Sequence, residues 1–167
     1  MRQIFIYFLT LILFVGCKKE QSSRVDIYVL KSFTSTVDQS TTPATVSITN
    51  AVLEDTPLVG DKDVKFYTKA TTTFTLKKDV QTAIQNYGPD KGFAVTVNSQ
   101  PIYYGKFHPM YLSSMTYGVA TIAPFLYINN ELKIDFVNLE GNSFLQQLDK
   151  RNDSRILNTL KATNRLR

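Results

Sequence analysis

The chain has 167 residues, 43% of them hydrophobic and 20% charged, and a formal net charge of +5. This length allows one ordinary domain with a real core, so a second domain is not expected. Residues 24–149 carry 10 Lys and Arg against 12 Asp and Glu, whereas residues 150–167 carry six basic residues and one acidic residue. A domain that is basic throughout is therefore excluded, because the excess of positive charge lies in the C-terminal tail.

The N-terminus has the pattern of a secretory signal. An apolar run over residues 4–15 follows a charged Arg2 and is succeeded by the charged residues 18–20. The run is too short to span a bilayer comfortably. The segment Leu13–Cys17 matches a bacterial lipobox, with Phe14 where leucine is usual. We therefore expect residues 1–16 to be a lipoprotein signal peptide that is removed.

Cys17 is the only cysteine, so no internal disulfide can form. Lipidation would consume its thiol, and several acyl chains hold a protein firmly because each buried methylene adds about 0.8 kcal/mol. We expect Cys17 to carry the lipid, residues 17–23 to form a polar tether, and residues 24–167 to form a single domain in the cell envelope. The outer membrane is the favoured location, facing either the periplasm or the surface. The alternative is an ordinary cysteine in a signal anchor.

The first half of the domain has the alternation of strands. Val25, Ile27 and Val29 recur at every second position, and residues 45–53 and 71–76 are similarly rich in β-branched and aromatic residues. These patterns predict strands at residues 24–32, 45–53 and 71–76, a loop at residues 35–43 and an irregular turn at residues 63–67.

The second half mixes helices with strands. Asp79 precedes apolar residues at helical spacing, which predicts a short helix over residues 79–87. Two apolar clusters near the end predict two helices, with Asp153 or Ser154 capping the last. The expected fold class is α+β, a mostly antiparallel sheet with one short central helix and two C-terminal helices. The remaining strands are expected at residues 93–97, 102–107, 117–122, 125–128 and 131–137, with residues 98–101 and 129–130 as turns.

Three segments resemble a group of uncharacterised lipoproteins from Bacteroidetes: Val25–Phe33, Phe93–Phe107 and Lys150–Leu157. The resemblance covers most of the mature chain and implies envelope placement. That group has no assigned activity.

A second similarity is architectural and relates the chain to the periplasmic head domain of the protein-export subunit SecD. Asn98-Ser99 stands where that domain has Asp-Gly, and no membrane helices follow. The segments that share its order are Ile48–Ala51, Phe74–Leu76, Asp79–Tyr87 and Ala94–Tyr103.

Catalytic and cofactor signatures are absent from the sequence. The chain has one histidine and no glycine-rich phosphate loop, so we expect no metal and no other cofactor. His108 could form a dyad with Ser113 or Ser114, but no acid lies beside it to orient the ring. An envelope hydrolase that uses His108 and a nearby serine is therefore the alternative function.

Residues 103–117 contain an unusual density of aromatic and sulfur-containing side chains. Strict alternation buries only half of a strand, so some of them should be exposed, and such side chains suit recognition surfaces. The alternative is that they cover the sheet. The leading hypothesis is a non-enzymatic envelope lipoprotein that binds another envelope protein. The candidate binding residues are Tyr103, Tyr104, Phe107, His108, Tyr111 and Tyr117.

The basic tail should face phospholipid headgroups, lipopolysaccharide phosphates or an acidic partner, because an exported protein seldom meets nucleic acid. The alternative is a solvated helix face. The candidate residues for contact with an anionic surface are Arg155, Lys161, Arg165 and Arg167.

Overall fold

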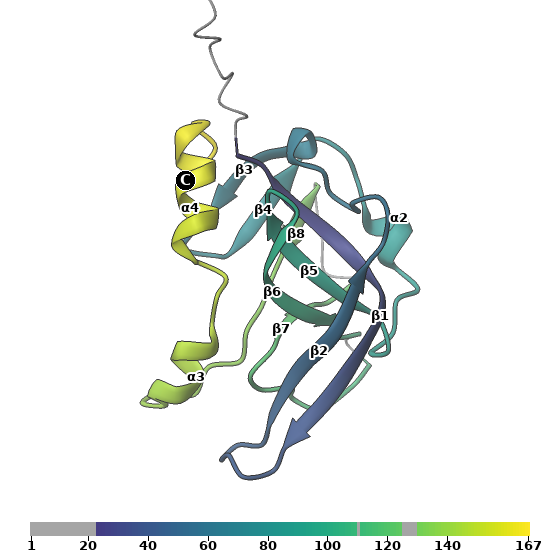
Figure 1. Cartoon of the computed structure of the whole chain (residues 1–167), viewed down its shortest axis with the longest axis vertical. Coiled ribbons are helices and arrows are strands. Elements are labelled where there is room, and N and C mark those ends of the chain that lie inside the picture. The colour runs from purple at the N-terminus through teal and green to yellow at the C-terminus, as the bar shows by residue number, and fades with distance from the viewer. Residues whose placement is uncertain (1–22, 110, 125–129) are drawn as a thin grey trace, which may run out of the picture.

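Two sheets and three α-helices make up the described residues of this computed structural model, namely 23–109, 111–124 and 130–167. The larger sheet has the order β2-β1-β5-β6-β7 and the smaller one β3-β4-β8 (Figure 1). Among the strands of the described residues, only β6 and β7 pair with each other in parallel, so the expected α+β class is confirmed. The strands are β1 (Val25–Asp38), β2 (Thr45–Leu53), β3 (Val64–Thr68), β4 (Thr73–Leu76), β5 (Gly92–Val97), β6 (Gln100–Phe107), β7 (Ala120–Ile122) and β8 (Glu131–Lys133).

The helices are short. α2 (Gln81–Ile84) lies within the range expected for the central helix, and Asp79 accepts a hydrogen bond from the Gln81 N–H at 2.7 Å. α3 (Ser143–Leu148) and α4 (Ser154–Ala162) are the two expected C-terminal helices. Asp153 caps α4 by accepting from the Arg155 N–H at 2.9 Å, as expected. A single 3₁₀ turn covers Asp61–Asp63.

β1 has two unlike halves. Residues 25–30 are all buried, and residues 25–29 pair with β5, whereas residues 31–38 are almost all exposed and pair with β2. The prediction of a loop at residues 35–43 is therefore wrong for residues 35–38, which belong to β1. Ser and Thr are common in loops, but they also suit an exposed strand, and pairing with β2 supplies their backbone partners. Figure 1 shows this hairpin extending beyond the rest of the domain.

Two further expectations are corrected. Residues 64–67 belong to β3, which pairs with β4, so they are not an irregular turn. The β5–β6 loop contains only Asn98 and Ser99, because Val97 already pairs with Gln100. Both loop residues have positive φ, 52° and 64°, as a tight hairpin turn requires. The strand expected at residues 125–128 lies outside the described residues.

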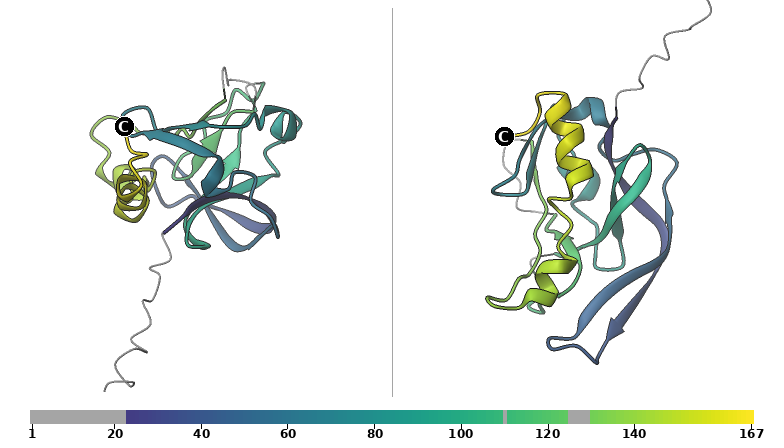
Figure 2. Two further views of the ribbon diagram at one scale, coloured as in Figure 1. Left: turned by 90° about the horizontal axis from the view of Figure 1, so that it is seen from above. Right: turned by 60° about the vertical axis from the view of Figure 1, so that its left-hand side comes forward.

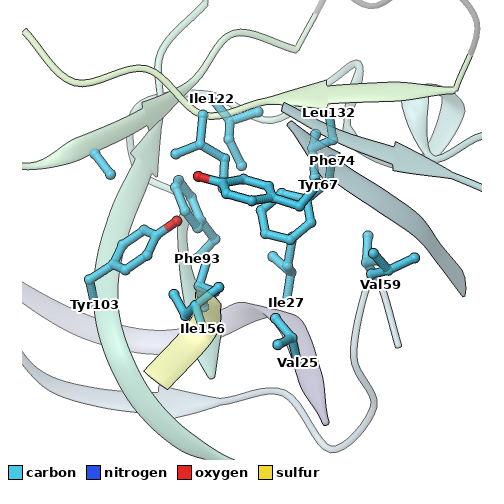
Figure 3. Packing of buried hydrophobic residues seen from close by; sticks show 14 of the residues in the cluster. Val25, Ile27, Val59, Tyr67, Phe74, Phe93, Tyr103, Ile122, Leu132 and Ile156 are labelled. Atoms are coloured by element: carbon cyan, nitrogen blue, oxygen red, sulfur yellow. The ribbon is translucent and has the colours of Figure 1, made fainter. Parts of the chain in front are cut away.

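The core lies between the sheets and is rich in aromatic rings (Figure 3). The ring centroids of Phe93 and Phe107 are 5.7 Å apart, and those of Tyr67 and Phe74 are 4.5 Å apart. Gly105 is required opposite Phe93, since a Cβ there would come within 2.1 Å of that ring. Gly105 thus leaves room for the Phe93 ring in the core, while its neighbours Tyr104 and Lys106 are half-buried.

α4 and the C-terminus close one side of the domain. Ile156 and Leu160 of α4 are fully buried, and the chain then runs beside β3. Tyr67 donates its N–H to the Arg165 carbonyl and accepts from the Arg167 N–H, both at 2.8 Å. Figure 2 shows α3 and α4 on the same side of the domain, with α3 toward the end that carries the β1–β2 hairpin. The last residues therefore act as an additional strand at the edge of β3.

Candidate functional site

The six aromatic-segment candidates fall into different environments. Tyr103 and Phe107 have 9% and 0% exposure and belong to the core. Tyr104 and His108 are half-buried on the alternate side of the chain, and Tyr111 is 74% exposed. Tyr117, the sixth, is half-buried and packs against the core. The structure thus removes two of the six from the surface, and the other four differ in their exposure.

Two of these residues nevertheless line a cavity in the described part of the chain. Tyr103 and Tyr104 form part of a pocket of about 260 Å³ that lies between the start of β2 and α3. We call it the wedge pocket. Its surface is mainly apolar, and it is bordered by one acidic and one basic side chain, Asp38 and Lys150. Its other lining residues are Thr45, Val46, Ser47, Ile48, Gly118, Val119, Ala120, Phe136, Phe144 and Leu148.

The pocket exists because two segments that begin side by side then separate. Tyr117 runs parallel to β2 and its carbonyl accepts the Val46 N–H at 2.8 Å. After this contact the chain turns at Gly118, where φ is +79°, and enters β7. β2 instead continues along β1. The space between the diverging segments is the wedge pocket.

Gly118 is fixed by both its backbone and its neighbours. Its φ lies in the region that L-residues rarely adopt, and a Cβ would come within 2.7 Å of the Thr45 Cβ. The close contact between the two segments therefore depends on glycine at this position. The sequence around Gly118 did not predict this requirement for glycine, because Thr45, the residue that it packs against, is distant in the chain.

α3 covers one side of the pocket. Asn142 caps the helix by accepting the Leu145 N–H at 3.0 Å, and its amide donates to the Thr42 carbonyl at 3.4 Å. Leu145 is fully buried and anchors the helix, whereas Phe144 is 44% exposed. The sequence predicted α3 but not its role, since only the fold places Phe144 beside β2.

A cluster of charged side chains supports Phe136, one of the residues that line the pocket. Arg151 makes a two-point ion pair with Asp149, at 2.9 and 2.7 Å, and its guanidinium lies 5.8 Å from the centre of the Phe136 ring. Arg151 also donates to the Thr72 hydroxyl and the Ile134 carbonyl. Burial of Asp149 opposes ionisation, but the hydrogen bonds from Arg151 outweigh it and lower the pKa of that carboxyl. These residues therefore hold Phe136 in place as a fixed wall.

Two buried tyrosines lie near this cluster. Tyr67 donates its hydroxyl to the Arg151 carbonyl at 3.1 Å. Burial raises the pKa of both Tyr67 and Tyr103 above the usual value for tyrosine. Figure 3 shows the two rings directed into the same part of the core. Both hydroxyls are therefore neutral at physiological pH, which suits structural support of the pocket.

The basic candidates differ in how they are held. Arg155 is exposed and pairs with its own helix cap, Asp153, at 2.8 Å. Arg165 is mostly buried and pairs with Asp61 at 2.6 Å, so its role is to fix the tail. Lys161 and Arg167 are exposed. The four basic residues therefore do not form one free cationic surface.

The alternative chemistry receives no supporting geometry in the described residues. His108 donates its backbone N–H to the Ile122 carbonyl at 2.8 Å, while its ring makes no hydrogen bond or ion pair with another described residue. Ser113 and Ser114 are exposed. In the same residues, no group of His, Cys, Asp or Glu side chains could hold a metal ion.

Comparisons with known proteins give no match. No protein-family model matches the chain, and neither the curated proteins nor the solved structures contain a significant match. The resemblances drawn from the sequence therefore stay predictions. Among the described helices, none is both long and apolar enough to cross a bilayer. Cys17 and the rest of the lipobox lie outside the described residues.

Proposed function

We propose that this chain is a cell-envelope lipoprotein, anchored through Cys17, whose domain is a non-enzymatic binding module. The wedge pocket supports the binding part of this proposal. Apolar cavities bordered by a few polar groups are the usual form of ligand sites. Here the aromatic side chains of Tyr104, Phe136 and Phe144 line the cavity, and the Arg151 guanidinium lies against the Phe136 ring.

The direction of the pocket fits a tethered protein. Ser23, the first described residue, leaves the domain beside the turn of β5 and β6, where Asn98 donates to the Ser23 hydroxyl at 3.4 Å. The β1–β2 hairpin and α3 lie at the opposite end of the domain (Figures 1 and 2). In a protein tethered at its N-terminus, the pocket would therefore face away from the membrane and toward partners.

The binding part can be tested by cross-linking the intact lipoprotein in envelopes and identifying captured proteins by mass spectrometry. We expect Phe144→Ala and Tyr104→Ala to lose a reproducible partner, because both remove apolar surface from the wedge pocket. Tyr111→Ala is the matched control, since Tyr111 is exposed but does not line the pocket. If only Tyr111→Ala lost the partner, the binding site would lie around Tyr111, and the assignment of binding to the wedge pocket would be overturned.

The anchor requires a separate experiment. Labelling of cells with an alkyne-bearing fatty acid should mark the wild-type protein but not Cys17→Ala, which should no longer sediment with membranes. Equal membrane attachment of both forms would overturn lipidation. A His108→Ala variant in the same strain tests the hydrolase alternative, because an unchanged phenotype there would exclude catalysis by His108.

A further inference from the structure

The open edge of β2 beside the wedge pocket identifies the class of ligand. We infer that the domain binds an extended, uncharged segment of another protein, which adds as a short strand to β2 and places one apolar side chain in the wedge pocket. This inference rests on the proposed function and deepens it, since it states what the pocket holds.

The backbone of β2 supplies the first argument. In an antiparallel pair, successive residues direct their N–H and C=O groups alternately toward the partner strand and away from it. Val46 directs its N–H away from β1, to Tyr117. Ile48, two residues later, has its N–H and C=O on the same outer side. No described residue pairs with them, because β2 has only β1 as a neighbour beyond the Tyr117 contact.

The second argument is that Tyr117 already performs the proposed interaction within the chain. It makes the first backbone contact with β2 and then departs at Gly118. A bound segment would continue from the place that Tyr117 leaves. The C-terminal tail pairs with β3 through Tyr67 in the same way, which shows that this fold accepts short added strands.

The third argument is the character of the edge. Natural sheets protect exposed edges with charged side chains, prolines or bulges. Residues 45–53 contain no charged residue and no proline. The first irregularity that would protect this edge is at Asn50, where φ is +50° and the register with β1 shifts nearby. The open part is therefore short, about residues 46–49, and adjoins the wedge pocket through Val46, Ser47 and Ile48.

The occupant follows from these features. An acyl chain would fill an apolar pocket but could not use the backbone groups of Ile48, whereas an extended polypeptide satisfies both. Asp38 and Lys150 border the pocket with opposite charges, so neither sign of net charge on the ligand is favoured. The start of β2 and α3, which border the pocket, lie at the end of the domain opposite the start of β1, which places the pocket away from the membrane lipid in a tethered protein (Figure 1).

The test uses the full mature protein in detergent and a phage-displayed library of random nonapeptides. The best peptide is then resynthesised in three forms: first unmodified, and then N-methylated at one or the other set of alternate backbone nitrogens. All three forms keep the same side chains, but N-methylation removes strand donors. We expect micromolar binding by the first form and at least tenfold weaker binding by one of the two possible N-methylated patterns. Selected sequences should alternate and contain one apolar or aromatic side chain at a fixed position.

Hydrogen exchange locates the contact. In the free protein the Ile48 amide should exchange quickly, while the amides of Ser47 and Thr49, which face β1, exchange slowly. Peptide binding should protect Ile48. On the protein side, Ile48→Pro removes the outward N–H, and Ile48→Val is the matched control that retains it. If Ile48→Pro fails to fold, the N-methylated peptides still decide the question.

Several outcomes would overturn the inference. Binding of both N-methylated peptides as tightly as the unmodified peptide would exclude strand addition but leave the wedge pocket as a site for apolar side chains. That outcome would overturn this inference without overturning the proposed function. Selection of no peptide would exclude a peptide ligand. Self-association that Ile48→Pro abolishes would identify a second copy of the chain as the occupant. Binding of a free fatty acid in the wedge pocket, with no peptide selected from the library, would identify an acyl ligand instead.

Discussion

The two halves of β1 show how one strand can serve two purposes. Residues 25–30 are buried, with residues 25–29 paired to β5, and residues 31–38 project with β2 into solvent. The buried half contributes apolar area, which provides most of the folding free energy. The exposed half contributes little area, but it carries the open edge of β2 past the wedge pocket. Stability and recognition are therefore separable along a single strand.

The largest expected effect is on the buried half. Ile27 is fully buried, so Ile27→Ala should lower the free energy of unfolding by about 2 to 5 kcal/mol. Val37, in the exposed half, is 54% exposed, and Val37→Ala should change the free energy of unfolding by less than about 0.5 kcal/mol. Urea unfolding followed by circular dichroism measures both. Similar costs for the two variants would show that the hairpin is part of the cooperative core.

A second variant breaks the contact that ties the exposed half to the body. Gly118→Ala combines an unfavourable φ with an overlap at Thr45, so it should cost about 2 to 4 kcal/mol. Gly141→Ala is the control, because φ is +76° there but a Cβ would meet nothing within 4 Å. Its cost should be about 1 kcal/mol. Equal costs in thermal unfolding would mean that the Tyr117 contact is not closely packed.

The smallest expected effect concerns α4, which covers the buried half of β1. Asp153→Ala removes the helix cap and should cost about 1 kcal/mol. Hydrogen exchange should show faster opening of α4 and no change in residues 31–38. Faster exchange in that exposed half as well would indicate that the two halves open together.

The same carboxylate gives a pH dependence. The hydrogen bond from Arg155 lowers the pKa of Asp153 from 3.8 to about 2. Because the pKa is lower in the folded state, this carboxylate contributes stability above about pH 4, and the contribution is lost as pH falls toward 2. Asp153→Asn keeps a capping oxygen without the titration. Its stability should fall less steeply than that of the wild type between pH 4 and pH 2, and parallel curves would contradict this assignment.

Part of the site could be predicted and part could not. Of the binding candidates in the aromatic segment, Tyr103 and Tyr104 line the wedge pocket, while their role in binding stays a prediction. Alternation alone could not tell which face of β6 was buried, because Tyr103 and Tyr104 are equally suited to either face. Phe136 and Phe144 were missed, since nothing local distinguishes a pocket wall from a core residue.

The sequence by itself determined the local elements of this protein. The period-two patterns of β2 and β5, the cap at Asp153 and the helical spacing in α4 follow from interactions within a few residues. Only the tertiary structure decided where β1 ends, that β3 is a strand, and that β2 parts from Tyr117 to leave a pocket. These features depend on backbone partners far away in the chain, which local propensity does not specify.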